Sequence, residues 1–107
     1  MMLKTEKNII YLGKKKIILT IEIMCAYKIF NKIIVLYNYM ETKHNLVCID
    51  LNGKLRWEAE LATNEEKEGY CYVLKYWPNI VANSWSNNEC VINSKTGKIL
   101  SKKFTKT

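Results

Sequence analysis

Apolar and polar residues alternate most clearly over residues 55–61, which read LRWEAEL. A period of two places the apolar side chains on one face of a β-strand and the charged side chains on the other. We therefore predict a strand over 55–61 with one buried face and one solvated face. The preceding segment, residues 45–51 (NLVCIDL), is apolar at nearly every position and predicts a strand that is apolar on both faces.

The dipeptide Asn52-Gly53 separates these two segments. It is the strongest short-range signal for a two-residue type I′ turn, whose central residues both need positive φ. We therefore predict a β-hairpin over 45–61. Two further segment pairs have the form apolar strand, Gly-Lys, apolar strand: residues 8–23 and residues 89–104.

These hairpins are part of a longer internal repeat. Residues 31–39 precede the second hairpin and residues 78–85 precede the third, and both combine a polar turn, Ile and Val, and an aromatic residue near the end. The glycines of the three turns recur at a period of about 40 residues. Repetition at this period is typical of a β-sheet unit with three or four strands.

The second hairpin, NLVCIDLNGKLRWEAEL, resembles the blade repeat of pyrroloquinoline-quinone-type β-propellers, in which a strand ending in Asp, a Gly-Lys turn and a strand carrying Trp recur. The segment NECVINSKTGKILSKKF is similar to a degenerate copy that keeps Thr96-Gly97-Lys98 but has Asn93 in place of Asp. Two to three such units cannot close a propeller ring, so the resemblance implies no cofactor site. We expect an all-β fold in which repeated antiparallel hairpins form two packed sheets, as an open sandwich or an incomplete propeller of about eight to ten strands.

The composition fits one globular domain spanning residues 1–107, with 49% hydrophobic and 25% charged residues. The first eight residues are too polar for a signal peptide. The most apolar region, residues 17–40, is interrupted by Glu22, Lys28 and Lys32, so it does not suit a membrane span. We expect a cytoplasmic protein that does not associate with a membrane.

No pattern in the chain predicts catalysis or metal binding. The cysteines, Cys25, Cys48, Cys71 and Cys90, form no CxxC pair, and His44 is the only histidine. We interpret the cysteines as small apolar residues of strands, with a disulfide pair or a redox switch as the alternative. The sequence therefore predicts a protein that is not an enzyme and has no catalytic, cofactor-binding or metal-binding residues.

Charge is distributed unevenly along the chain. The net charge is +7, yet half of the ten acidic residues lie between positions 58 and 68, where Lys67 is the only basic residue. Basic residues gather elsewhere, at positions 14–16 and at 98, 102, 103 and 106. Such a run is often only a solvated loop. The alternative is an electronegative projection that enters a basic cleft of a partner protein, with neighbouring tyrosines as anchors if they are exposed rather than buried in the core. The residues that we predict to contact the partner are Glu58, Glu60, Glu65, Glu66, Glu68, Tyr70 and Tyr72.

The function that these features favour is a protein-binding inhibitor. It would be an immunity protein that neutralises a cognate bacterial toxin, such as a nuclease of contact-dependent growth inhibition, by occluding the active site of the toxin. A nuclease cleft must be basic to bind phosphates, and carboxylates could imitate those phosphates. We expect a monomer or one half of a heterodimer. The alternatives are a nucleic-acid-binding module with a basic, aromatic surface and a non-enzymatic structural repeat protein.

Overall fold

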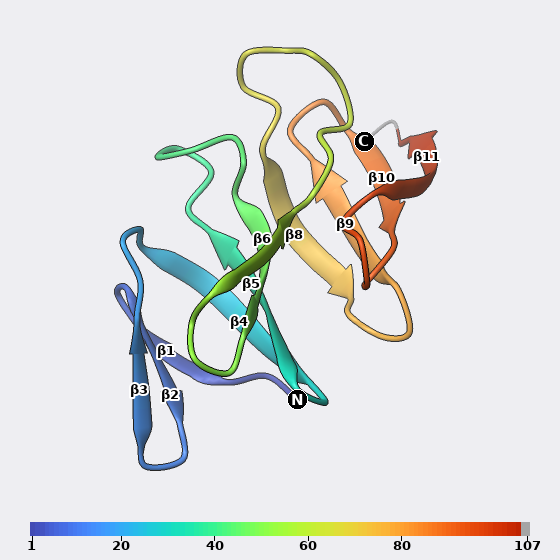
Figure 1. Cartoon of the computed structure of the whole chain (residues 1–107). Coiled ribbons are helices and arrows are strands. Elements are labelled where there is room, and N and C mark those ends of the chain that lie inside the picture. Colours follow the sequence, from blue (N-terminus) through green and yellow to red (C-terminus); the bar gives the residue numbers. More distant parts are fainter. Residues whose placement is uncertain (106–107) are drawn as a thin grey trace.

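The structure is a computed structural model that describes residues 1–105, and these residues form eleven strands and no helix (Figure 1). Lys106, one of the basic residues noted above, lies outside the described residues. The strands are β1 (Lys4–Glu6), β2 (Ile9–Leu12), β3 (Lys15–Ile18), β4 (Ile23–Ile29), β5 (Lys32–Tyr37), β6 (Leu46–Asp50), β7 (Leu55–Glu58), β8 (Tyr70–Lys75), β9 (Ile80–Ser84), β10 (Asn88–Ile92) and β11 (Ile99–Phe104). Within residues 1–105 there is accordingly no helix that could cross a membrane.

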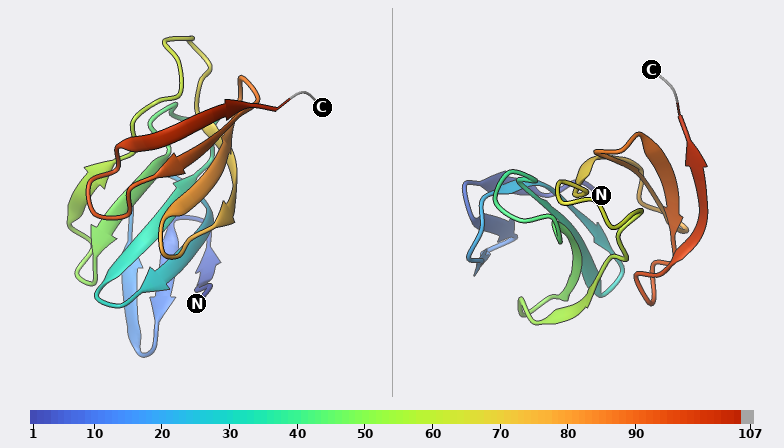
Figure 2. Two further views of the ribbon diagram at one scale, coloured as in Figure 1. Left: turned by 90° about the vertical axis from the view of Figure 1, so that its right-hand side faces the viewer. Right: turned by 90° about the horizontal axis from the view of Figure 1, so that it is seen from above.

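The strands form three antiparallel sheets, each joining neighbours in the sequence. We call them the N-terminal sheet (β1-β2-β3), the central sheet (β4-β5-β6-β7) and the C-terminal sheet (β8-β9-β10-β11). The all-β prediction is confirmed, but there are three sheets rather than two. The first hairpin builds a sheet of its own because residues 4–6 pair with β2. Figure 2 shows the central sheet between the other two.

The central sheet is buried on both faces. On β6, Val47 and Ile49 pack toward the N-terminal sheet, while Leu46 and Cys48 pack toward the C-terminal sheet. This alternation produces two separate hydrophobic cores, one on each side of the central sheet. The prediction that residues 45–51 form a strand that is apolar on both faces is confirmed, and the two cores give the reason.

The turn between β6 and β7 differs from the predicted type I′ turn. Gly53 has a φ of +90°, but Asn52 does not have positive φ. The N–H of Asp50 donates to the Lys54 carbonyl oxygen (2.9 Å), so these two residues pair and the loop between them contains three residues, 51–53. The Asp50 carboxylate accepts hydrogen bonds from the backbone N–H groups of Asn52 (2.8 Å) and Lys54 (2.9 Å). A three-residue loop that ends with a residue of positive φ is the next most common hairpin connection. In the corresponding turn, Asn93 Oδ1 likewise accepts a hydrogen bond from the N–H of Lys95 (2.8 Å).

Trp57 joins the central and C-terminal sheets. Its indole Nε1 donates a hydrogen bond to the Ser94 carbonyl oxygen (3.2 Å), in the turn between β10 and β11. In the same turn, a Cβ at Gly97 would lie 2.5 Å from Trp57 Cε3, so only glycine allows this close approach. The turn glycine of one hairpin is therefore a packing partner for the tryptophan of the preceding one.

The strand predicted over 55–61 is shorter and less regular than its alternation suggests. β7 ends at Glu58, and a bulge between Cys48 and Ile49 shifts the register so that Leu55 pairs with Ile49. Trp57 is buried as predicted. Leu55 lies instead on the face of Ile49 and is 53% exposed, because the shift moves it to the other face of the sheet.

Candidate partner-binding surfaces

Glu68 lies in the interior and not on the predicted acidic surface. Its side chain is fully buried and accepts hydrogen bonds from the Thr63 hydroxyl and from the Ser86 hydroxyl (2.9 Å). The backbone N–H of Ser86 donates a further, longer bond to the same carboxylate (3.3 Å). The prediction that Glu68 contacts a partner is therefore wrong. Glu68 instead ties the loop between β7 and β8 to the turn between β9 and β10.

The other four glutamates of the predicted acidic surface do not lie together in one loop. Glu60 Oε1 accepts a hydrogen bond from the backbone N–H of Ile99 (2.9 Å), so this carboxylate is bound to the start of β11. Glu58 ends β7 and lies opposite Val47. Glu65 and Glu66 are exposed in the loop between β7 and β8. Glu65 and Glu66 are therefore the two residues of the predicted acidic surface that lie in an exposed loop.

Tyr70 and Tyr72 lie on opposite faces of β8 because a bulge shifts the register between them. Tyr70 is 1% exposed and donates its hydroxyl to the Glu60 carbonyl oxygen (2.6 Å), so its predicted contact with a partner is also wrong. Burial raises the pKa of the Tyr70 hydroxyl above its usual value. Tyr72 is exposed, and its hydroxyl accepts a hydrogen bond from Asn83 Nδ2 (3.0 Å).

Exposed aromatic side chains do lie beside Glu66, but they come from other connections between strands. Three connections meet at one end of the molecule: the β5–β6 loop, the β7–β8 loop and the β9–β10 turn (top of Figure 1). They surround an open pocket of about 420 Å³, and we call the lining of this pocket the loop-end surface. Its lining residues are Tyr39, Met40, Glu41, Thr42, Lys43, Glu66, Lys67 and Trp85.

Tyr39 and Trp85 form the aromatic part of the loop-end surface. Their ring centroids are 5.6 Å apart, and the side chains are 38% and 46% exposed. The lining also contains two glutamates and two lysines, so it is charge-balanced rather than acidic throughout. Such a surface offers both apolar contact area and charged groups, the two components that protein interfaces combine.

Buried polar groups hold the loop-end surface in place. Asn45 is fully buried and donates to the carbonyl oxygens of Tyr37 (2.9 Å) and Tyr70 (2.6 Å), while its Oδ1 accepts from the Tyr70 N–H (2.7 Å). These bonds join the β5–β6 loop to the start of β8. Together with the bonds of Glu68, they fix the connections relative to one another before any partner binds.

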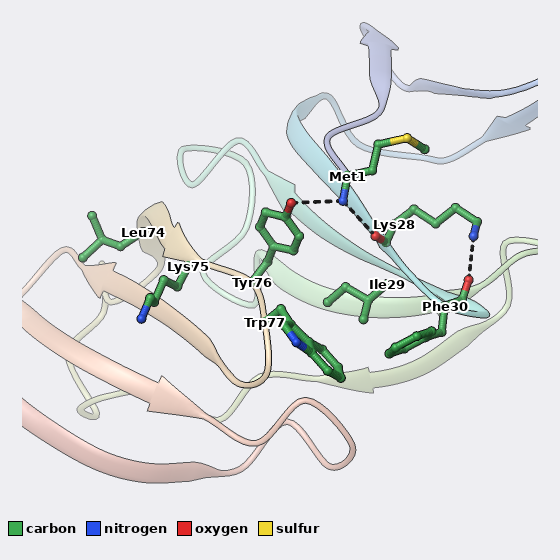
Figure 3. A pocket seen from close by; sticks show the side chains of 8 residues that line it. All are labelled: Met1, Lys28, Ile29, Phe30, Leu74, Lys75, Tyr76 and Trp77. Carbon is green, nitrogen blue, oxygen red and sulfur yellow. Dashed lines mark hydrogen bonds between the residues drawn. The ribbon is translucent and has the colours of Figure 1, made fainter.

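A second exposed aromatic surface lies between the β4–β5 turn and the end of β8 (Figure 3). We call this cavity of about 500 Å³ the aromatic cleft. Phe30 is 71% exposed and meets Trp77 edge to face, with the ring centroids 5.0 Å apart. Phe30 has a φ of +52°, an unfavourable region for a bulky residue. Lys28 and Lys75 also line the cleft, so its charged side chains are basic.

The sequence analysis did not find the aromatic cleft. Ile29 and Lys32 pair at the ends of a hairpin, which places Phe30 in the two-residue turn between them. The signal that could have revealed the cleft is Phe30 itself, because a bulky aromatic residue stands directly before Asn31 in a tight turn, where a polar residue or glycine is usual. Beside the cleft, Tyr27 stacks on Tyr76 with ring centroids 4.6 Å apart, and burial raises the pKa of Tyr27 to about 12.

The four cysteines are free, and Cys25, Cys48 and Cys90 lie within or beside one hydrophobic core. Cys48 and Cys90 are buried, and Cys25 and Cys71 are partly buried. Burial raises the pKa of each thiol, which keeps the thiols protonated at neutral pH. Among residues 1–105, no group of three or more His, Cys, Asp or Glu side chains is placed to hold a metal ion.

A family model matches residues 1–104, from the N-terminal sheet to the end of β11. The chain belongs to that family, described as Domain of unknown function (DUF7957). No curated protein and no solved structure matches the chain. The DUF7957 match includes both the loop-end surface and the aromatic cleft, and its description assigns no activity to either. The resemblance to propeller blades accordingly stays a prediction.

Proposed function

We propose that this DUF7957 protein is a non-catalytic inhibitor that binds another protein through its loop-end surface. In this proposal it is an immunity protein of the bacterial cytoplasm, and it neutralises a toxin of contact-dependent growth inhibition by covering the active site. The observation that carries the proposal is the exposed Tyr39–Trp85 pair beside Glu66, on connections held by buried hydrogen bonds.

Aromatic anchors are the side chains that most often dominate binding energy at protein interfaces. Tyr39 and Trp85 combine large apolar rings with polar atoms, and both are partly exposed. Because Glu68 and Asn45 already fix the surrounding connections, a partner would not have to order them on binding. This pre-ordering supports tight binding by a small surface.

Glu65 and Glu66 give the proposal its electrostatic part. Both are exposed in the β7–β8 loop, which projects from the end of the molecule (Figure 1). A nuclease neutralises phosphates with Lys and Arg, so its cleft attracts carboxylates. We expect Glu65 and Glu66 to steer association with such a cleft and the aromatic pair to supply most of the affinity.

The proposal requires a toxin domain encoded next to the gene of this protein, and the decisive experiment uses that domain as the binding partner. Calorimetry measures the affinity for that domain, and co-expression measures protection of growth. Trp85→Ala removes one aromatic anchor, and we expect it to weaken binding about 30-fold, the effect of a typical hot-spot residue. Unchanged affinity and unchanged protection with Trp85→Ala would refute binding through the loop-end surface.

Charge reversal tests the electrostatic part separately. Glu65→Lys combined with Glu66→Lys is expected to slow association and to reduce its dependence on salt. The matched control is Glu6→Lys, because Glu6 is exposed on β1 in the N-terminal sheet, away from the loop-end surface. If the control slows association as much per charge as the loop variants do, only the net charge matters and the proposed docking by the loop is wrong.

The aromatic cleft favours a second candidate, single-stranded nucleic acid. Exposed rings flanked by lysines can stack bases and contact phosphates. Phe30 and Trp77 would supply the rings, and Lys28 and Lys75 the charge. Fluorescence anisotropy with a labelled single-stranded RNA tests this candidate. Binding that is lost with Phe30→Ala would support it, and no binding at low salt would end it.

A further inference from the structure

Phe30 has an unusual backbone conformation for a bulky residue. It is the first of the two residues in the β4–β5 turn, and its φ is +52°, whereas Asn31 does not have positive φ. This is the pattern of a type II′ turn, whose first central residue is usually glycine because a Cβ is unfavourable there. Within residues 1–105, the other non-glycine residues with positive φ are Lys7 and Asn87, which are both polar. The turn therefore places a phenylalanine where the backbone favours glycine.

Burial of the Phe30 ring does not compensate for this conformation. The side chain is 71% exposed, and it meets the ring of Trp77 at an interplanar angle of 75°. An edge-to-face contact of this kind leaves at least one flat face of the Phe30 ring away from Trp77. Unfavourable backbone conformations are concentrated at sites that bind ligands, where the side chain they present has a function. The exposed ring in a strained turn therefore indicates that Phe30 contacts a ligand.

Lys28 holds the strained turn and also supplies charge beside the ring. Its Nζ donates a hydrogen bond to the Phe30 carbonyl oxygen (2.7 Å), as the dashed line in Figure 3 shows. An ammonium group has three donors, so two of them remain for an anionic ligand. A phosphate bound to Lys28 would consequently lie next to Phe30. The residues within 1–105 that line the aromatic cleft include a second lysine, Lys75, and no carboxylate side chain.

The two lysines of the lining favour a nucleic acid over a protein as the occupant of the cleft. Lysine is depleted at protein interfaces relative to the rest of the surface. Sites for single strands, in contrast, combine aromatic rings that stack on bases with basic groups that contact phosphates. A duplex offers no such base, because its bases are already stacked on one another. The ligand chemistry that fits Phe30 and Lys28 is therefore an unpaired base with a neighbouring phosphate.

We propose that Phe30 is the residue that selects unpaired bases in the aromatic cleft, and that the β4–β5 turn accepts an unfavourable backbone in order to present this ring. Lys28 stabilises the turn and contacts the phosphate beside the stacked base. The inference rests on the second candidate function, the binding of single-stranded nucleic acid, and it does not involve the loop-end surface. It names the side chain that distinguishes a single strand from a duplex.

Fluorescence anisotropy of the full chain tests the stacking. The probe is a labelled oligothymidylate of about eight nucleotides, which lies within the usual site sizes for single strands. Phe30→Ala should lower the affinity about tenfold or more, the effect of losing one stacked base. The matched control, Phe30→Tyr, keeps a ring and should bind as the natural chain does. A strand of the same length without bases should bind the natural chain and Phe30→Ala equally, because it offers nothing to stack.

Urea unfolding tests whether the backbone of Phe30 is strained. Phe30→Gly and Phe30→Ala both remove the ring, but only glycine adopts positive φ without a penalty. Glycine is less stable than alanine at an ordinary position, whereas at this position we expect Phe30→Gly to have the higher urea midpoint. Both variants should lose the same amount of affinity for the oligothymidylate. The loss of binding would then be separate from any loss of stability.

Lys28→Gln tests the phosphate contact. It removes the charge of the side chain, so the slope of log affinity against log salt concentration should decrease by about 0.7, the contribution of one phosphate contact to a single strand. The matched control is Lys14→Gln, because Lys14 is exposed in the turn between β2 and β3 and does not line the cleft. Lys14→Gln should leave the slope unchanged.

Several results would overturn the inference. Equal binding of the oligothymidylate by Phe30→Ala and the natural chain would refute stacking on Phe30, even if the chain binds single strands. A higher urea midpoint for Phe30→Ala than for Phe30→Gly would refute the strained turn. Equal binding of a duplex, or displacement of the oligothymidylate by a polyglutamate peptide of the same charge, would show that the cleft recognises charge alone. If no single strand binds at low salt, the second candidate function ends together with this inference, and the loop-end proposal is unaffected.

Discussion

Gly97→Ala tests the contact that joins the central and C-terminal sheets. Gly97 has a φ of +77°, where a residue with a Cβ loses about 1–2 kcal/mol. Its new Cβ would also lie 2.5 Å and 2.8 Å from two carbon atoms of the Trp57 indole and 3.0 Å from the Glu58 carbonyl oxygen. Relieving such overlap in a packed core typically costs about 1–3 kcal/mol. We therefore expect Gly97→Ala to lower the free energy of unfolding by about 2–5 kcal/mol.

Gly13→Ala is the matched control for this substitution. Gly13 has a φ of +61°, yet a Cβ there meets no atom within 4 Å. It should therefore lose only the backbone contribution of about 1–2 kcal/mol. Urea unfolding followed by circular dichroism measures both variants. In a Trp57→Leu background, Gly97→Ala should lose much of its excess effect, because the ring that it strikes is absent.

The reasoning is wrong if Gly97→Ala and Gly13→Ala destabilise the chain equally. The close approach of the turn to Trp57 would then contribute nothing beyond the backbone conformation. It is also wrong if the effect of Gly97→Ala is the same in the natural and Trp57→Leu backgrounds, because the two sites would not be coupled.

Three further predictions concern side chains that are buried or partly buried. Glu68→Ala leaves the hydroxyl donors of Thr63 and Ser86 without their acceptor and should lower the free energy of unfolding by about 1–3 kcal/mol in urea; an unchanged midpoint would contradict this. The pKa of Tyr27 is about 12 in the folded chain, against 10.0 for the ordinary tyrosine. The contribution of Tyr27 to the free energy of unfolding is therefore fully present below pH 10 and is lost as the pH rises toward 12. Tyr27→Phe should reduce this loss in unfolding curves measured at alkaline pH. Cys48 and Cys90 should react with Ellman's reagent only as fast as the chain unfolds, and rapid labelling of both in the folded protein would contradict their burial.

Local patterns predicted the strands well. The Gly-Lys turns and the period-two alternation located all three hairpins, and the segment that forms β6 was correctly predicted to be apolar on both faces. The predicted type I′ turn between β6 and β7 was wrong because Asn52-Gly53 is compatible with both a two-residue and a three-residue loop. The Asp50 carboxylate, which accepts bonds from two backbone N–H groups, accompanies the longer loop.

The candidate site was harder to predict because it depends on contacts between distant residues. Glu68 looked like one more member of an acidic run, and only the arrival of Ser86 from the next hairpin explains its burial. Tyr70 and Tyr72 share a face by simple alternation, but the bulge between them sends them to opposite faces. Sequence periodicity contains no signal for either event. Tyr39 and Trp85 were recognised only as ends of equivalent strands, and their proximity follows from the stacking of the sheets.

The separation of the two hydrophobic cores has a consequence for how the molecule responds to stress. The cores share no side chain, and the central sheet separates them. Stability in such a stack behaves as a sum of unit and neighbour contributions, as in repeat proteins. The outer layers can then open one at a time while the middle layer stays folded, so hydrogen exchange would proceed at graded rates from the two ends inward.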